Sequence, residues 1–183
     1  MKNRAVFLDR DGTINIDTNY VKSEDELIIY PFAAKAIKML NDAKYLVIIV
    51  TNQSGISRGY YNHEDLAKIH EKLKSEIYKE EKAKIDKIYY CPSHPDEKSR
   101  RRKPAPGMIE EAEKEFNIDL NKSFIIGDKL SDIELGINTG IKPLLVLTGK
   151  GKEENEKLKN KEYSEQVKVI DNLLKAVEYI LNK

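Results

Sequence analysis

Residues 5–13 read AVFLDRDGT, an apolar run that ends in two carboxylates separated by one residue. The run shows no alternation of apolar and polar side chains, which is typical of a strand buried on both faces of a parallel sheet. We therefore expect a strand over residues 5–9, with Asp9 and Asp11 at its carboxyl end. In open α/β sheets this end of the strands is where ligands bind.

Apolar runs of the same kind alternate with helical patterns along the rest of the chain. Further strands are expected over residues 45–51, 85–90, 123–127, 142–147 and 167–170. Apolar residues at helical spacing predict helices over residues 33–40, 62–81, 108–116 and 173–181, with one more from Ser131. This rhythm predicts an α/β fold with a doubly wound, mostly parallel sheet and helices on both faces.

Length and composition restrict the class of protein. The 183 residues suit a single domain over residues 1–183, and a formal net charge of +1 offers no global field to collect nucleic acid or an anionic membrane. The longest apolar run, residues 45–50, is far shorter than the roughly 20 residues that cross a bilayer. One cysteine allows no internal disulfide, which fits a reducing compartment. We expect a cytoplasmic protein with no nucleic-acid or membrane partner.

Four polar clusters follow the predicted strands along the chain. They read DRDGT at residues 9–13, TNQSG at 51–55, RKP at 102–104 and GDKLSD at 127–132. A calcium loop starting at Asp9 is excluded, because Ile14 and Tyr20 occupy the positions that need glycine and glutamate. Taken singly, Thr51 or Asp128 could be an ordinary turn or capping residue. Four such clusters at strand ends in one order indicate a shared site instead.

In their order, the four clusters resemble the motifs of the haloacid dehalogenase superfamily of phosphotransferases. Longer strings, among them FLDRDGTIN, VTNQSGISRG and IIGDKLSDI, are similar to its branch of heptose bisphosphate phosphatases and histidinol phosphatases. The resemblance implies a Mg²⁺-dependent phosphatase that acts on a small phosphorylated metabolite, in first place the 7-phosphate of the sugar bisphosphate heptose 1,7-bisphosphate. The alternatives are a histidinol-phosphate phosphatase and a catalytically silent domain of this fold that binds a phosphorylated ligand.

Phosphate monoesters react slowly because the dianion repels nucleophiles, so a site has to neutralise charge and protonate the leaving alkoxide. We predict that Asp9 is the nucleophile, forming an aspartyl phosphate, and that Asp11 is the general acid and base. Asp9, Asp128 and the backbone carbonyl of Asp11 are oxygen ligands that suit Mg²⁺. The predicted substrate-binding residues supply hydrogen bonds or positive charge: Thr51, Asn52, Gln53, Arg102, Lys103 and Lys129.

Several neighbouring residues lie outside this assignment of roles. Asp132 lies one helical turn after the carboxylate of the fourth cluster, where it either orients the site or faces solvent. His63 and His70 lie seven residues apart on one predicted helix, and we expect both at the surface. Arg100 and Arg101 are placed to meet the second phosphate of a sugar bisphosphate.

Many members of the branch carry a structural Zn²⁺ on the loop before the RKP motif, with ligands arranged as Cys-x-His and Cys-x-Cys. Here Cys91 is present, but Ser93, Ser99 and Arg101 stand at the other three positions, and His94 alone is nearby. Because a closed structural zinc site needs four ligands, we expect no zinc.

The intervals between the clusters limit the size of any inserted domain. The 42 positions from Asp9 to Thr51 and the 52 from Thr51 to Lys103 are already filled by predicted loops, helices and strands. No large cap domain fits. Short loops over residues 15–30 and 91–101 are therefore expected to shape the pocket as mobile lids.

Overall fold

Six parallel strands form one sheet in the computed structural model, which describes residues 2–182. The strands are β1 (Ala5–Leu8), β2 (Leu46–Asn52), β3 (Lys87–Cys91), β4 (Phe124–Gly127), β5 (Lys142–Val146) and β6 (Lys168–Ile170). They stand in the order β3-β2-β1-β4-β5-β6, so the winding reverses between β1 and β4. Such a reversal is the switch point at which doubly wound sheets bind ligands.

The centre of the sheet is apolar because it is enclosed on every side. Every residue of β1 and β4 is buried. Val6 of β1 pairs with Val47 on one side and with Phe124 on the other. A strand enclosed in this way has no polar face, which explains the unbroken AVFL run. Asp9 is the first residue beyond β1, and the polar chemistry begins there.

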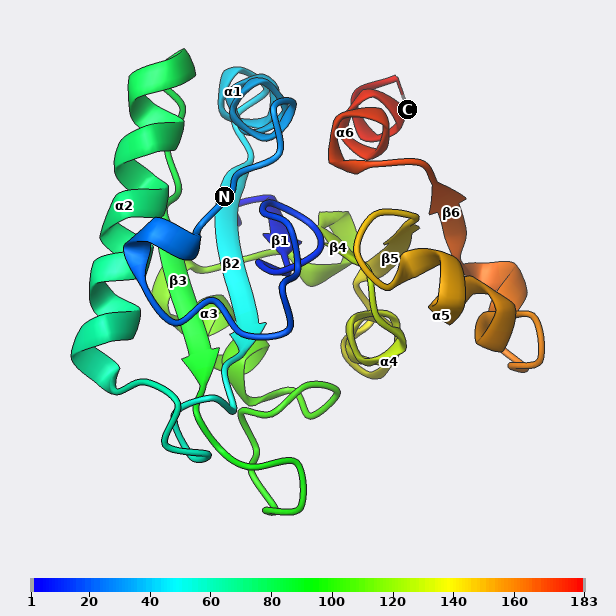
Figure 1. Ribbon diagram of the computed structural model, residues 1–183. Helices are drawn as coiled ribbons and strands as arrows, with labels where there is room; N and C mark the ends of the chain where they lie inside the picture. The colour runs from blue at the N-terminus through cyan, green and yellow to red at the C-terminus, as the bar shows by residue number, and fades with distance from the viewer. Residues whose placement is uncertain (1, 183) are drawn as a thin grey trace.

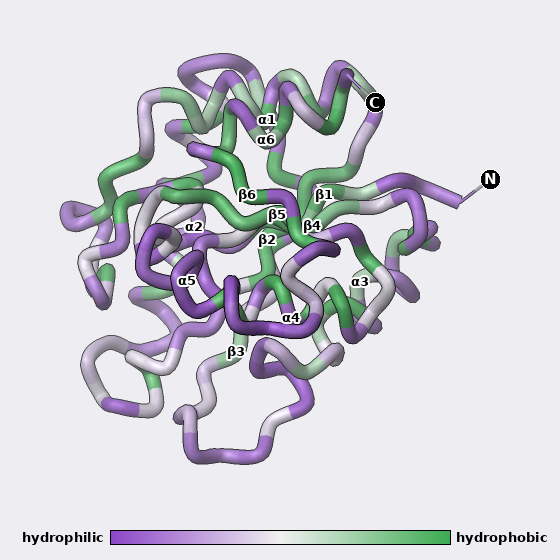
Figure 2. Tube along the Cα trace, turned by 90° about the vertical axis from the view of Figure 1, so that its right-hand side faces the viewer, coloured by the Kyte–Doolittle hydropathy of each residue, from purple (hydrophilic) through white to green (hydrophobic). Residues whose placement is uncertain are grey.

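Helices cover both faces of the sheet (Figure 1). The described helices are α1 (Ala33–Asp42), α2 (His63–Glu81), α3 (Gly107–Phe116), α4 (Leu130–Thr139), α5 (Gly151–Leu158) and α6 (Leu173–Leu181). Apolar residues of α1, α2 and α6 pack on one face, and those of α3 and α4 pack on the other. The tube in Figure 2 is hydrophobic along the central strands and hydrophilic along most of α5. The predicted doubly wound parallel sheet is confirmed.

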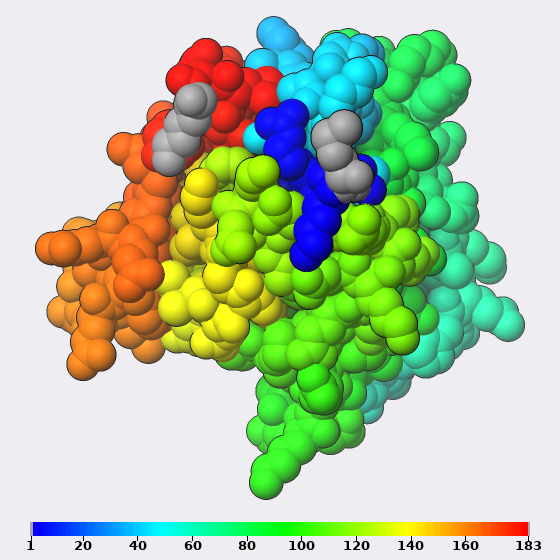
Figure 3. Space-filling view, turned by 180° about the vertical axis from the view of Figure 1, so that it is seen from behind, coloured from blue at the N-terminus to red at the C-terminus, as the bar shows by residue number. Residues whose placement is uncertain are grey.

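Two loops extend beyond the carboxyl ends of the strands. The loop between β1 and α1 contains a 3-10 helix, Glu24–Glu26, and is tied back by the hydrogen bond from the Ile16 amide to the Ile28 carbonyl, at 2.9 Å. The loop between β3 and α3 projects from the body of the molecule (Figures 1 and 3). Neither loop adds a cap domain, as expected. Their mobility as lids stays a prediction.

None of the helices in residues 2–182 combines the length and the apolar character needed to cross a membrane.

Candidate active site

Lys103 joins the two halves of the sheet at their carboxyl ends. Its ammonium group donates to the Val50 carbonyl at 2.8 Å and forms ion pairs with Asp9 at 2.9 Å and with Asp132 at 2.6 Å. Burial alone would lower the pKa of Lys103, but the charges of Asp132 and Asp9 outweigh burial and raise it. Lys103 is therefore a permanent positive charge beside Asp9.

The carboxylate of Asp9 uses one oxygen for its contacts. Oδ1 accepts a hydrogen bond from the Arg10 amide at 2.7 Å and meets the Lys103 ammonium. The contacts described for this carboxylate, within residues 2–182, all involve Oδ1. A carboxylate that is fixed through one oxygen keeps the other available for attack or for a metal ion.

Asp11 is held more completely than Asp9. The Arg10 side chain donates from Nε to Oδ1 at 3.1 Å and from Nη2 to Oδ2 at 2.8 Å. Asn15 donates to Oδ1 at 2.9 Å and Gln53 donates to Oδ2 at 2.9 Å. Burial would raise the pKa of Asp11, but the charge of Arg10 and these hydrogen bonds together lower it. The network fixes the orientation of the Asp11 carboxyl group.

Asp128 follows β4 and is enclosed by backbone from two other loops. Its Oδ2 accepts a hydrogen bond from the Lys150 amide at 2.8 Å, whereas Oδ1 is buried without a partner. A Cβ atom built on Gly12 or on Gly149 would lie 2.1 Å from Oδ2. Both glycines have positive φ, so the chain needs glycine there for its conformation and for this close approach. Burial raises the pKa of Asp128 to about 8.

The buried carboxylates form a candidate metal site. Asp9, Asp128 and Asp132 each offer an oxygen, and these oxygens lie within 4.8 Å of one another. Asp132 Oδ1 is paired with Lys103 and its Oδ2 accepts from the Lys129 amide, whereas Asp128 Oδ1 is buried without a partner. Anionic oxygen donors with an orphaned buried atom fit a hard divalent cation.

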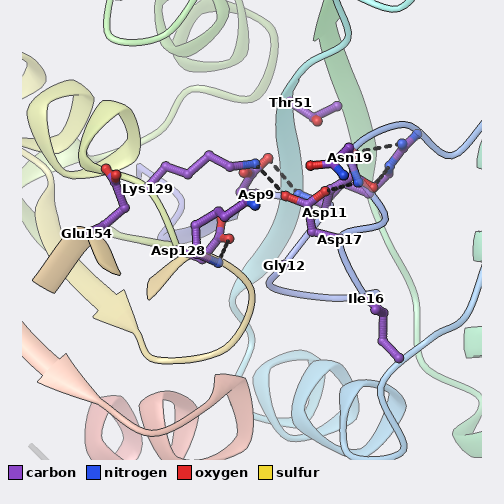
Figure 4. A network of polar contacts seen from close by, with 12 residues as sticks. Asp9, Asp11, Gly12, Ile16, Asp17, Asn19, Thr51, Asp128, Lys129 and Glu154 are labelled. Atoms are coloured by element: carbon purple, nitrogen blue, oxygen red, sulfur yellow. Dashed lines mark hydrogen bonds and ion pairs between the residues drawn. The ribbon is translucent and has the colours of Figure 1, made fainter. Parts of the chain in front are cut away.

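A cavity of about 340 Å³ opens beside these residues. It is lined by Asp11, Asp17, Asn19, Tyr20, Asn52, Gln53, Ser54, Tyr61, Arg102, Lys103, Lys129, Ser131 and Lys150. Lys129 reaches from the start of α4 toward Asp9 and Asp17, as Figure 4 shows, and forms an ion pair with Asp17 at 3.1 Å. The cavity is therefore lined by several cationic side chains next to carboxylates, and the cations suit an anionic ligand.

Comparisons with known proteins agree with this geometry. Residues 100–176 match the HAD-hydrolase-like family. A D-glycero-beta-D-manno-heptose-1,7-bisphosphate 7-phosphatase of Haemophilus ducreyi is 41% identical, with 82% of this chain and 86% of that protein covered. The corresponding enzyme of Pasteurella multocida is 38% identical over 96% of this chain and 98% of its own.

A solved structure shows the same fold throughout. The D,D-heptose 1,7-bisphosphate phosphatase of B. bronchiseptica, complexed with magnesium and phosphate, is 34% identical and superposes with a TM-score of 0.90 over 98% of each chain. The chain belongs to the haloacid dehalogenase superfamily, in the heptose bisphosphate phosphatase branch. It is a phosphatase; the solved relative is complexed with magnesium and phosphate, and in this chain a cluster of acidic residues could hold a metal ion.

Most of the predicted site residues of the phosphatase lie together, but two of them make contacts other than those expected. The side-chain amide of Asn52 is engaged by the Lys103 backbone, donating to its carbonyl at 3.2 Å and accepting from its amide at 3.1 Å. Thr51 is buried and its hydroxyl accepts from Gln53 at 2.8 Å. These residues position Lys103 and Gln53 directly. Their contact with substrate stays a prediction.

The structure decides one open interpretation and overturns another. Asp132 is fully buried against Lys103 and orients the site. Arg100 and Arg101 are directed toward Glu110 and Glu111 of α3, in ion pairs that include Arg101 Nε at 3.1 Å from Glu111. Neither arginine lines the cavity, so the expectation that they meet a second phosphate is wrong. Local carboxylates on the next helix compete for them.

The expectation that both histidines lie at the surface is wrong for His70. Only 7% of His70 is exposed, and its ring meets Arg10. His63 is exposed and its Nδ1 lies 3.0 Å from the Tyr90 hydroxyl.

Sequence reasoning missed the segment after β5. Gly149 lies directly against the Asp128 carboxylate, and the Lys150 amide donates a hydrogen bond to that carboxylate. The Thr148 hydroxyl donates to the Gly12 carbonyl at 2.6 Å. This segment follows a predicted strand at its carboxyl end, which is the signal that could have found it.

The zinc-free state of the loop before the RKP motif stays a prediction. Cys91 is buried with its Sγ 3.5 Å from the Ser99 hydroxyl, and His94 lies 3.2 Å from Asp96. These side chains therefore have partners within the loop.

Proposed function

We propose that the chain is a Mg²⁺-dependent phosphatase that removes the 7-phosphate of D-glycero-D-manno-heptose 1,7-bisphosphate through an aspartyl phosphate. The observation that carries the proposal is the buried ion pair of Asp9 and Lys103, in which Lys103 also lines a cavity with several cations. The relatives with about 40% identity, which are named for this reaction, support the substrate. Residues 1–183 act as one phosphatase domain in the cytoplasm.

The first half-reaction transfers the phosphoryl group to the protein. An oxygen of Asp9 attacks phosphorus while the bond to the sugar C7 oxygen breaks. The Arg10 charge favours ionised Asp11 in the free protein, and the approaching phosphate dianion opposes that effect, so that Asp11 takes up a proton. Asp11 then gives this proton to the leaving oxygen, so the sugar departs as an alcohol. Lys103 neutralises negative charge at Asp9 as the dianionic phosphate approaches.

The second half-reaction returns the protein to its starting state. Asp11 takes a proton from water, and the water oxygen attacks phosphorus of the aspartyl phosphate. The bond between phosphorus and the Asp9 oxygen breaks, which releases inorganic phosphate and restores the carboxylate. The two carboxyl groups therefore have different tasks, in agreement with their different hydrogen-bonding.

The carboxylates of Asp9 and Asp128 and the backbone carbonyl of Asp11 are the groups that hold Mg²⁺ in this proposal. The unpartnered Asp128 Oδ1 supports this ligand set. Bound Mg²⁺ supplies positive charge that neutralises phosphoryl oxygens and orients the phosphate for attack in line. Oxygen ligands with room for waters are the environment that this ion prefers.

The second phosphate of the substrate meets cations on the cavity wall. Arg102 and Lys150 line the cavity, and Arg102 Nη1 is held by the Ser93 carbonyl at 3.0 Å. Arg102→Ala should raise KM for the bisphosphate about tenfold, the loss of one charge-assisted contact of roughly 1.4 kcal/mol. Arg100→Ala, which removes a cation outside the cavity, is the matched control and should leave KM unchanged.

The test is release of inorganic phosphate from a panel of esters, with added Mg²⁺ and again after EDTA treatment. The panel contains heptose 1,7-bisphosphate, histidinol phosphate and p-nitrophenyl phosphate. The proposal expects heptose bisphosphate to give the highest kcat/KM and expects EDTA to abolish release until Mg²⁺ is returned. Preference for histidinol phosphate would overturn the substrate, and release that survives EDTA would overturn the metal requirement.

A further inference from the structure

Arg10 is buried completely although it carries a full charge. Its guanidinium group is fixed at all three nitrogens. Nε and Nη2 meet Asp11, Nη2 also donates to Gln53 Oε1 at 3.1 Å, and Nη1 lies 3.2 Å from His70 Nε2. The parallel N–H groups of this guanidinium fork hold a carboxylate in one plane only if the guanidinium group itself cannot rotate.

The contact with Arg10 determines the state of His70. Arginine has donors and no acceptor, so His70 Nε2 has to accept this hydrogen bond and the ring is neutral with its proton on Nδ1. Burial, followed by the charge of Arg10, lowers the pKa of His70 to about 3, which agrees with a neutral ring. The edge of the His70 ring also packs on Tyr90, with ring centroids 5.9 Å apart.

We propose that His70 is a positioning residue for catalysis, which acts by fixing the Arg10 guanidinium group and, through it, the acid and base Asp11. The inference rests on the proposed role of Asp11 in proton transfer. His70 lies on α2, far along the chain from the DRDGT motif, and it touches Arg10 and not the carboxylates. Without an acceptor at Nη1, the guanidinium group keeps Gln53 as its one anchor apart from Asp11 itself, and it holds the Asp11 carboxyl group less firmly in its plane.

The test compares two leaving groups, because a fault in Asp11 affects a poor leaving group more than a good one. The sugar alkoxide needs a proton as it departs, whereas p-nitrophenolate hardly needs one. The measured quantity is the ratio of kcat/KM for heptose bisphosphate to kcat/KM for p-nitrophenyl phosphate. A merely structural loss of active protein lowers both values together and leaves this ratio unchanged.

His70→Leu removes the acceptor and should lower the ratio about tenfold, a part of the roughly 10²–10⁴-fold that general acid catalysis contributes. His70→Gln offers an amide oxygen in place of Nε2 and should keep the ratio within about twofold of the wild-type value. His70→Asn, too short to reach Arg10, provides a second variant without the contact if the leucine variant does not fold. His63→Leu is the matched control, because His63 lies on the same helix and contacts Tyr90 but not Arg10.

The outcomes separate this inference from the proposed function. A lowered ratio in His70→Leu or His70→Asn, restored in His70→Gln, supports the positioning role. An unchanged ratio in both acceptor-free variants, with Asp11→Asn lowering it, overturns the role of His70 alone. If Asp11→Asn itself leaves the ratio unchanged, the proposed task of Asp11 is overturned, and the inference with it.

Discussion

Two glycines, Gly12 and Gly149, lie against Asp128 at the candidate metal site. Gly149 has a φ of +55°, and a Cβ atom there would lie 2.6 Å from the Gly12 Cα as well as against the Asp128 carboxylate. Side chains at such positions force the neighbouring atoms to move. The position of Asp128 therefore depends on a residue that is distant in sequence and carries no chemical group.

We predict that Gly149→Ala displaces Asp128 and raises the Mg²⁺ concentration needed for half-maximal activity by about tenfold or more, as loss of a group supporting a metal ligand does. Gly59→Ala is the matched control, because Gly59 also has positive φ but a Cβ there would meet nothing within 4 Å. Titration of activity with Mg²⁺ measures both variants. Equal Mg²⁺ requirements in the two would contradict this account of Gly149.

His70 makes the stability of the fold depend on pH. Its pKa is about 3 in the folded protein, against an ordinary value of 6.5 that applies in the unfolded chain. Below pH 6.5 the unfolded chain binds a proton that the folded protein does not, so stability is complete above that pH and falls with pH from 6.5 toward 3.

The wild type should therefore lose about 2 kcal/mol more than His70→Gln between pH 7.5 and pH 5.0, since each unit below 6.5 is worth about 1.4 kcal/mol. Urea unfolding at the two pH values measures this difference, and all other titrating groups cancel between the variants. Parallel loss of stability in both proteins would show that folding does not shift the pKa of His70, which would contradict a neutral, buried ring.

At the scale of elements, α2 carries His70 and owes its beginning to a capping box. The Asn62 side chain accepts hydrogen bonds from the Glu64 and Asp65 amides, and Asp65 accepts one from the Asn62 amide. Donors at a helix start are otherwise unsatisfied, so the reciprocal contact stabilises the first turn.

Asn62→Ala should lower the free energy of unfolding by about 1 kcal/mol. The exposed Glu76→Ala change on the same helix is the control and should stay within about 0.5 kcal/mol of the wild type. Urea denaturation measures both free energies of unfolding, provided that their dependence on urea concentration is the same in the variants and the wild type. An equal loss of unfolding free energy in the two variants would show that the helix cap is not the cause of the destabilisation.

Elements and residues whose structure depends on their neighbours in the sequence could be predicted. The apolar strands and the carboxylates that follow them depend on neighbouring residues, so β1, β4, Asp9 and Asp128 could be predicted. His70 stands at apolar helical spacing with Leu66, and this spacing is the signal for its burial.

Side chains whose partners come from another element were harder to predict. Arg100 and Arg101 could not be placed, because their contacts with α3 depend on the path of a loop. For the same reason the sequence left open whether Asp132 faces solvent, since Lys103 reaches it from a different part of the chain.

At the scale of the whole molecule, the strand order explains how a protein of net charge +1 attracts a dianion. The reversal of winding beside β1 brings together the loops that follow the carboxyl ends of strands from both halves of the sheet. Arg102, Lys103, Lys129 and Lys150 thereby line one cavity. Cations are thus gathered where the proposal places the phosphate, without any large net charge on the whole chain.

The measurement that tests the account most directly is rapid acid quenching of the reaction with heptose bisphosphate labelled in its 7-phosphate. The account predicts a transient, base-labile label bound to the protein, located by peptide mapping at Asp9. Asp9→Asn should carry no label and show no turnover, although it keeps the fold and still binds the substrate. A label on another residue, or turnover by Asp9→Asn, would contradict the central role of Asp9.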